Sequence, residues 1–262
     1  MRILHVTDFH FRQRWYEWLA SRASEYEAVC FTGDFITMYT GQHQPSSDSR
    51  PSSPSGHASP IVAPDERAQA HWVGAWLKDW PASTPLFLCS GNHDHWPQKD
   101  DFIDDDAEGG WLRKTRRPGR IWADGDQSTV INGHRFLCVT WAHKPKTETT
   151  EPVVALVHEP PAGTDVSSTA RGDDGGDKTV AQAARDLPRG SFVLSGHVHE
   201  PRCWYAPVRT ALNGETVWAF NPGSCATDAT EPNYIVLDTT ARHAECHAWG
   251  KVLSLSFPNV TD

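Results

Sequence analysis

Five short motifs rich in histidine, aspartate and glycine stand out in the 262-residue sequence. Their side chains suit divalent metal ions, because carboxylate, imidazole and amide oxygen are ligands for Mn²⁺, Fe²⁺, Zn²⁺ or Ni²⁺, with Mg²⁺ a further candidate. The motifs contain no cysteine, which argues against a thiolate zinc site. In chain order the motifs are Asp8-Phe9-His10, Gly33-Asp34, Gly91-Asn92-His93-Asp94, His158 and Gly196-His197-Val198-His199.

A short apolar run precedes each of the five motifs, and each run is typical of a β-strand. Glycines in three motifs allow sharp turns and a close approach of the backbone to a ligand. The carboxyl ends of strands in an α/β sheet border one crevice, where ligands bind. We therefore expect the five motifs to converge. The predicted strands cover residues 2–7, 28–32, 86–90, 153–157 and 191–195.

The spacing within two motifs gives a further expectation. Asp8 and His10 are two residues apart, and so are His197 and His199. At an extended strand end, this spacing directs both side chains of a pair to the same side. Both side chains of each pair are therefore predicted to face the same crevice.

Helices are expected between several of these strands, over residues 12–26, 64–80 and 178–187. Such alternation predicts right-handed crossovers and a largely parallel sheet. In the second helix, Trp72, Trp76 and Trp80 recur every four residues, which predicts a stripe packed on the sheet. Alternating apolar and polar residues near the end of the chain predict antiparallel strands over 202–208, 216–220, 234–238 and 244–249.

Composition narrows the class of protein. The formal charge is -9, with 24 basic against 33 acidic residues, which argues against broad affinity for nucleic acid. The first residues do not form a signal peptide, and the chain has no apolar run long enough to span a membrane, so we expect a cytoplasmic protein. None of the cysteines has CxxC spacing, and we expect all to be reduced; they are Cys30, Cys89, Cys138, Cys203, Cys225 and Cys246.

The order and content of the motifs resemble the calcineurin-like metallophosphoesterases. That family shows D-x-H, G-D, G-N-H-[DE], H and G-H-x-H in this order, and the similarity extends over roughly residues 2–225. The turn Asn221-Pro222-Gly223-Ser224 adds support, since many members have it after the last histidine motif. The length suits one α/β domain over residues 1–262, and a stretch dense in Ser, Pro, Gly and His predicts a mobile loop inserted at about 42–60. The resemblance implies that the fold would be a four-layer α/β/β/α sandwich of two mixed sheets with helices outside, and that the metal site would lie on loops at one end.

The resemblance also implies a role for each motif residue. Asp8, His10 and His199 would hold one metal ion. Asn92, His158 and His197 would hold the other, and Asp34 would bridge the two.

The same resemblance assigns the catalytic roles. A hydroxide bridging the metals would attack phosphorus. His93 would protonate the leaving oxygen or stabilise charge on the phosphoryl group, and Asp94 would orient His93. Asn92 and His93 would contact the substrate.

The expected reaction is hydrolysis of a phosphate ester with an unidentified, nucleotide-like or other small substrate. The chain lacks the arginine that protein phosphatases of the superfamily carry shortly after G-D, and it has Asp94 in place of their glutamate. This favours a phosphodiesterase over a small-molecule phosphomonoesterase. A DNA or RNA nuclease is a weaker alternative, because only short strands follow Ser224. A non-catalytic scaffold is disfavoured, because all seven ligand positions and His93 are present.

Other histidines and the charged runs have plainer explanations. His5, His57, His71 and His134 are expected to be structural or exposed, and His95 and His143 are intermediate cases. The basic run from Arg113 to Arg120 suits a phosphate-rich substrate, but it follows an acidic run, and two solvated faces explain both runs more simply. Substrate choice is expected to depend on loops 42–60, 97–120 and 164–177.

Overall fold

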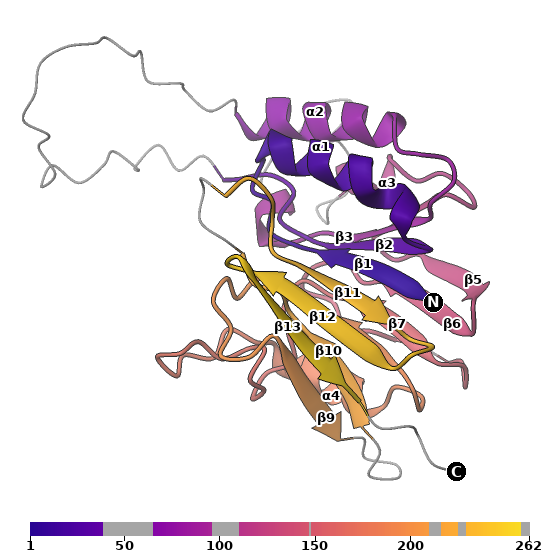
Figure 1. Ribbon diagram of the computed structural model, residues 1–262. Coiled ribbons are helices and arrows are strands. Elements are labelled where there is room, and N and C mark those ends of the chain that lie inside the picture. Colours follow the sequence, from indigo (N-terminus) through magenta and orange to yellow (C-terminus); the bar gives the residue numbers. More distant parts are fainter. Residues whose placement is uncertain (39–64, 96–109, 147, 210–215, 225–228, 258–262) are drawn as a thin grey trace, which may run out of the picture.

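The computed structural model describes residues 1–38, 65–95, 110–146, 148–209, 216–224 and 229–257. The predicted insertion at 42–60, with His57, lies outside these ranges, and so does Cys225. The described residues form two mixed β-sheets that pack face to face, with helices on their outer faces (Figure 1). This arrangement is the predicted α/β/β/α sandwich.

The first sheet has seven strands among the described residues. Its parallel centre consists of β1 to β4, and β11 pairs antiparallel with β1 to begin an antiparallel edge. The order across the sheet is β13 (Lys251–Ser256), β12 (His243–Ala248), β11 (Tyr234–Asp238), β1 (Arg2–Val6), β2 (Ala28–Thr32), β3 (Leu86–Cys89) and β4 (Ile121–Ala123).

The second sheet has six strands in the described part of the chain. Four neighbouring strands are parallel, and an antiparallel strand lies at each edge. The order is β5 (Gln127–Ile131), β6 (His134–Cys138), β7 (Val153–Leu156), β8 (Phe192–Leu194), β10 (Thr216–Phe220) and β9 (Tyr205–Arg209). The expected antiparallel strand β10 therefore pairs antiparallel with β9 but parallel with β8.

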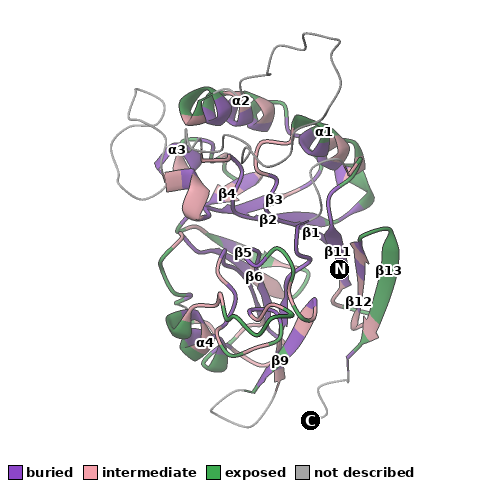
Figure 2. Cartoon of the chain, turned by 90° about the vertical axis from the view of Figure 1, so that its left-hand side faces the viewer, coloured by how far each residue is buried: buried purple, intermediate pink, exposed green. Residues whose placement is uncertain are grey.

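Helices cover the outer face of each sheet. The first sheet carries α1 (Gln13–Arg22), the 3₁₀ turn η1 (Ala23–Glu25), α2 (Glu66–Lys78) and the short α3 (Gly110–Arg113), whereas α4 (Lys178–Arg185) lies on the second. Figure 2 shows α2 and α4 at opposite ends of this layered arrangement, each buried toward its sheet and exposed outward. Asp65 caps α2 by accepting from the amide of Ala68, and Asp177 caps α4 by accepting from Thr179 and Val180, which satisfies free N–H groups of the first turn.

Three apolar cores separate the layers. The core between the sheets contains Phe87 and Phe136, whose rings stack at 4.0 Å between centroids; such a pair contributes about 1 kcal/mol beyond its burial. A second core joins α1 and α2 to the first sheet. The third joins α4, through Val180 and Ala184, to the outer face of the second sheet. Cores on both faces of both sheets explain why the central strands are continuous apolar runs.

Of the predicted tryptophan stripe, Trp80 lies beyond the end of α2 and is buried in the core against the first sheet, whereas Trp72 and Trp76 do not face the sheet as predicted. The face of α2 toward the sheet consists of Ala70, Val73 and Leu77. Trp72 and Trp76 are half-buried and contact the ring of Tyr16 in α1, at 5.3 and 5.0 Å between centroids. Four residues advance more than one turn of a 3.6-residue helix, so a four-residue stripe drifts around the axis, and here it drifts onto the neighbouring helix.

The described cysteines agree with a reduced protein. Cys30, Cys89, Cys138 and Cys246 are buried free thiols, and Cys203 is a partly buried one. Burial raises the pKa of Cys246 to about 12, as expected for an unreactive buried thiol. No helix among the described residues is long and apolar enough to cross a membrane.

Candidate metal centre

The five motifs converge at one end of the sandwich, as the strand order predicts. Three of them follow β1, β2 and β3 in the parallel centre of the first sheet. The other two follow β7 and β8 in the second sheet. The metal-ligating candidates therefore come from both sheets and face one another across the space between them.

One group of ligand atoms joins the first motif to the last. The Nε2 atoms of His10 and His199 are 3.1 Å apart, and His199 Nε2 lies 3.5 Å from Asp8 Oδ1. These three side chains each offer a ligand atom within 4.8 Å of the others. Asp8 is buried, whereas the His199 side chain is 49% exposed, so this group faces solvent on one side.

Asp34 lies between the histidines of the two sheets. Its Oδ2 is 3.8 Å from Nε2 of His10 and 3.8 Å from Nε2 of His93. Its Oδ1 is 3.4 Å from Nε2 of His158. Both oxygens of one buried carboxylate therefore point at different sets of nitrogen donors, which is the arrangement a bridging ligand needs.

A second group of donors gathers around Asn92. Its Oδ1 is 3.0 Å from His158 Nε2 and 3.1 Å from His197 Nδ1. The other ring nitrogen of His158 donates to the carbonyl of Thr32 at 2.8 Å. This bond leaves Nε2 of the neutral ring as the lone-pair donor and fixes its orientation, as outer contacts of metal-binding histidines commonly do.

The carboxylate of Asp8 supports a cation at this position. Oδ2 accepts from the hydroxyl of Thr7 at 2.6 Å and from the amide of His197 at 3.1 Å. Oδ1 is buried without a hydrogen-bond partner. A buried carboxylate oxygen without a donor is costly unless a cation satisfies it. The orphaned oxygen faces His199 and His10, so these residues fit a divalent ion.

The electrostatics of the site also favour a bound cation. Burial lowers the pKa of His158, but the Asp34 and Asp8 carboxylates and the bond to Thr32 outweigh it and raise this pKa to about 10. Burial lowers the pKa of His10 to about 4, although both carboxylates oppose the shift. The buried carboxylates thus favour positive charge at His158, where a bound metal ion would take the place of the ring proton, and His10 is neutral at pH 7 and offers a lone pair.

The backbone places these side chains in a way that differs from the extended geometry predicted from their spacing. Asp8, His10, Asp34 and His197 all have positive φ, between 44° and 66°. Non-glycine residues rarely adopt this left-handed region, and clusters of them mark functional sites. The strands end before the motifs, and tight turns direct the side chains inward. The prediction that extended strand ends do so is therefore wrong.

Two glycines of the motifs are required by close contacts. A Cβ atom on Gly91 would overlap Asp34 Oδ1, and one on Gly196 would overlap the Thr7 hydroxyl and the Asp8 carboxylate. These glycines let the loops of the two sheets approach each other directly behind the carboxylates.

His93 and Asp94 follow β3 in the short 3₁₀ helix η2 (Asn92–His95). Nδ1 of His93 accepts from the amide of Met38 at 3.0 Å, so the neutral ring carries its proton on Nε2, on the side of Asp34. Asp94 does not serve the predicted purpose of orienting His93. Its two oxygens accept from four backbone amides, at 2.8–3.3 Å, and none of these belongs to His93; the amides are those of Asp34, Phe35, Ile36 and Gly91.

Asn221 holds the last histidine motif in place. Its Nδ2 donates to the carbonyls of Gly196 and Val198 at 2.9 and 3.0 Å, and to that of Val166 at 3.3 Å. The sequence pattern indicated this turn as a motif without giving it a task. The structure shows that its amide clamps the loop that carries His197.

Sequence reasoning missed three supporting residues. Thr7 donates to Asp8, while the amide of Ser90 donates to Asp124 at 2.7 Å. The Ser90 hydroxyl accepts from the amide of Trp141 at 3.1 Å. Thr7 and Ser90 directly precede motif residues, and this adjacency is the signal that points to them. Asp124 follows β4, a strand that the sequence pattern did not predict.

The remaining histidines stay outside the ligand groups formed by the described residues. His5 is buried and its Nε2 lies 2.9 Å from the Thr32 hydroxyl. His95 lies 3.1 Å from the Ser90 hydroxyl and packs on Trp141. His71 and His143 are exposed, and His134 is half-buried beside Phe192.

Comparison with known proteins decides the family. The sequence model of the calcineurin-like phosphoesterases matches residues 1–201. The chain belongs to this family. Calcineurin-like phosphoesterases are dinuclear metal-dependent hydrolases of phosphate esters, so the chain is a metallophosphoesterase whose candidate ligand groups are those described above. A search of curated proteins gave no match.

The fold is shared with a solved structure. TT1561 of Thermus thermophilus is 12% identical and superposes with a TM-score of 0.51, covering 97% of this chain and 98% of that one. Yfce, a phosphoesterase from E. coli, is 15% identical, with a TM-score of 0.40 over 98% and 99% of the two chains. At such identities the likeness with TT1561 concerns the fold alone.

Proposed function

We propose that this metallophosphoesterase is a phosphodiesterase that works with two divalent metal ions. Asp8, His10 and His199 hold one ion in this proposal. Asn92, His158 and His197 hold the other, and Asp34 bridges them. The observation that carries the proposal is the position of Asp34, whose two oxygens point to donors from the two sheets.

Two divalent ions in such a centre supply Lewis-acid activation of a water molecule and of the phosphoryl group. The chain's own contribution to the chemistry is His93. The Met38 amide keeps the ring proton on Nε2, on the side of the metal ligands. From there His93 donates a hydrogen bond or a proton to a phosphate or leaving oxygen. His93 therefore takes the catalytic role, and Asp94 becomes a positioning residue for the Asp34 turn.

The charged side chains of the site support a phosphodiester as the substrate. The eight side chains of the site include two aspartates but no arginine or lysine. A diester monoanion needs less positive charge beside the metals than a monoester dianion. This supports a diester substrate, in line with the sequence, and leaves a small-molecule phosphomonoesterase as the second candidate. We also propose that the chain is one catalytic domain.

Hydrolysis of bis-p-nitrophenyl phosphate and p-nitrophenyl phosphate by the protein loaded with Mn²⁺, Ni²⁺, Zn²⁺, Fe²⁺ or Mg²⁺ tests this proposal. The expected result is a higher kcat/KM for the diester with at least one metal. A higher kcat/KM for the monoester with every metal would establish the second candidate. The same series identifies the preferred metal.

A further inference from the structure

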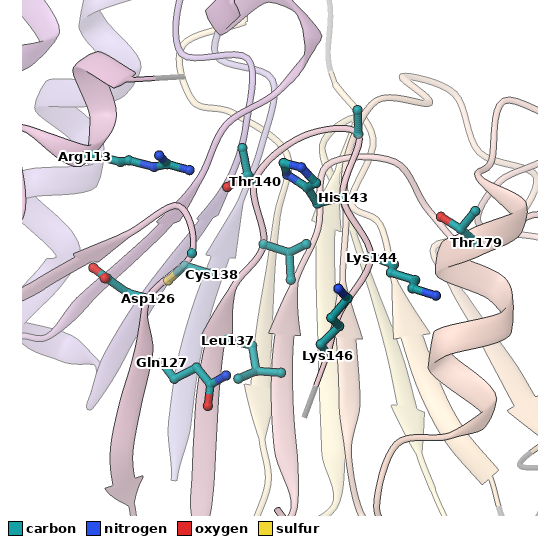
Figure 3. A pocket seen from close by; sticks show the side chains of 13 residues that line it. Arg113, Asp126, Gln127, Leu137, Cys138, Thr140, His143, Lys144, Lys146 and Thr179 are labelled. Atoms are coloured by element: carbon teal, nitrogen blue, oxygen red, sulfur yellow. The ribbon is translucent and has the colours of Figure 1, made fainter. Parts of the chain in front are cut away.

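A pocket of about 540 Å³ lies along the loop that follows β6 and contains none of the candidate metal ligands. Its floor consists of Leu137 in β6 and Val139 just after this strand, which are buried members of the core under α4. Figure 3 shows Lys144, Lys146 and, on α4, Thr179 on one side of the pocket, and Arg113 and Asp126 on the other. The pocket thus combines an apolar floor with a charged rim.

The rim of the pocket carries positive charge, although the protein as a whole is negatively charged. Arg113, Lys144 and Lys146 line the pocket, whereas the protein carries a formal charge of -9. The rim also contains one carboxylate, Asp126, and Arg116 pairs with it at 2.9 Å. Lys144 and Lys146 are exposed side chains two residues apart on the loop that follows β6. An anion in this pocket therefore meets net positive charge.

Direct contacts connect the pocket to the metal centre. The loop that begins at Thr140 lines the pocket, and its next residue, Trp141, donates its amide to the Ser90 hydroxyl at 3.1 Å. Ser90 immediately precedes Gly91-Asn92-His93. The same loop starts beside β7, since the amide of Val139 donates to the carbonyl of Leu156 at 3.0 Å, two residues before His158. The loop that lines the pocket is therefore fastened to two of the strand ends that carry candidate metal ligands.

We propose that the pocket binds a second phosphate of the substrate, so that the natural substrate is a phosphate ester whose organic part carries another phosphate. The scissile phosphate occupies the metal centre, the second phosphate meets Lys144 and Lys146, and the organic part lies on Leu137 and Val139. Lysines bind phosphate as mobile point charges, which suits a rim of exposed lysines. The inference rests on the proposed function and deepens it by naming the substrate class.

Competitive inhibition tests this inference with simple probes. Alkanediol monophosphates and the matching alkanediol bisphosphates, in a series of increasing chain length, compete with bis-p-nitrophenyl phosphate on the metal-loaded protein. We expect a bisphosphate of suitable length to have a Ki about tenfold lower than its monophosphate, the scale of charge-assisted hydrogen bonds at an exposed site. The advantage should shrink as salt is raised, because exposed charges are screened.

Charge reversal identifies the residues responsible. The double variant Lys144→Glu/Lys146→Glu should lose the bisphosphate advantage while keeping kcat/KM for bis-p-nitrophenyl phosphate, which has no second phosphate. Lys78→Glu, at the end of α2 on the outer side of the first sheet, is the matched control and should keep the advantage.

Two results would overturn the inference. One is equal Ki values for every bisphosphate and its monophosphate; the other is an unchanged advantage in the double variant. In both cases hydrolysis of bis-p-nitrophenyl phosphate would leave the proposed function standing. Absence of any phosphoesterase activity would instead remove the proposed function, and the inference with it.

Discussion

The two sheets contribute differently to the candidate metal centre. The first sheet supplies both carboxylates, Asp8 and Asp34, together with His10 and Asn92. The second sheet supplies only the imidazoles of His158, His197 and His199. Because the negative charge lies on one side, the first sheet should determine whether metal binds at all, and the second should adjust its affinity and geometry.

The two sides also differ in how their loops are held. The turn of Asp34 is fixed from within the first sheet, by the Asp94 carboxylate and its four backbone amides. The loop of His197 is fixed within the second sheet by the neutral amide of Asn221, and the backbone amide of His197 also donates to the Asp8 carboxylate of the first sheet. One half of the site is therefore anchored within its own sheet by a buried carboxyl group, whereas the other half depends on the Asn221 amide and on a hydrogen bond to the first sheet. Four substitutions probe the comparison.

Asp34→Ala should have the largest effect. It removes a buried carboxylate whose Oδ2 faces His10 and whose Oδ1 faces His158, so both ions should be lost and turnover should fall by at least about 10³-fold. Metal content is measured by elemental analysis after desalting. Asp165→Ala, an exposed aspartate, is the control and should keep its metal. A variant that still holds two ions per chain refutes the bridging role.

His93→Ala should reduce kcat for bis-p-nitrophenyl phosphate by about 10²–10⁴-fold, the usual contribution of a proton-transfer group. Its metal content should stay that of the parent, because His93 is not one of the proposed ligands. His71→Ala, an exposed histidine of α2, serves as control. Unchanged kcat on every diester tested would remove the catalytic assignment, and loss of metal would make His93 a ligand.

Asn221→Ala should weaken the half of the site that belongs to the second sheet. The carbonyls of Gly196, Val198 and Val166 lose a donor, so the free energy of unfolding should fall by about 2–4 kcal/mol. Metal affinity should fall about 10–100-fold, as for other contacts that hold ligands. Urea unfolding and metal titration measure these effects.

The control for Asn221 is Asn132→Gly, which removes an exposed amide at a positive-φ position that glycine tolerates. It should change stability by less than about 0.5 kcal/mol. If Asn221→Ala unfolds at the parent's urea concentration, the clamp contributes nothing and the contrast between the two halves fails.

His5→Gln should have the smallest effect, and one that depends on pH. Burial lowers the pKa of His5 to about 3, so the folded state excludes a proton that the unfolded state binds below about pH 6.5. The free energy of unfolding therefore has its full value above about pH 6.5 and decreases as pH drops toward 3. Between about pH 6.5 and 5 the decrease is about 2 kcal/mol. Glutamine does not titrate, so the variant should become more stable relative to the parent protein as pH falls. A parent–variant difference constant from about pH 5 to 8 contradicts this.

Much of the fold and site was predictable because local signals and chemistry agreed. The runs before Asp8, Asp34 and His158 are continuous apolar strands because cores cover both faces of both sheets. The ligand types were readable from the motifs. The order of strands then explains their convergence.

Other features were not predictable because they depend on contacts that no local pattern encodes. The task of Asp94 is set by amides of a turn 60 residues away in sequence. Trp72 and Trp76 pack on Tyr16 because α1 lies beside α2. The positive φ at Asp8 and His197 results from two loops that approach across glycines, which strand periodicity does not signal.

Titration of the metal-free protein with Mn²⁺, followed by hydrolysis of bis-p-nitrophenyl phosphate, tests the central claim most directly. A centre built from two sheets around Asp34 predicts that activity follows the doubly occupied fraction and reaches its maximum at two ions per chain. Full activity at one ion per chain, or without metal, would contradict the account.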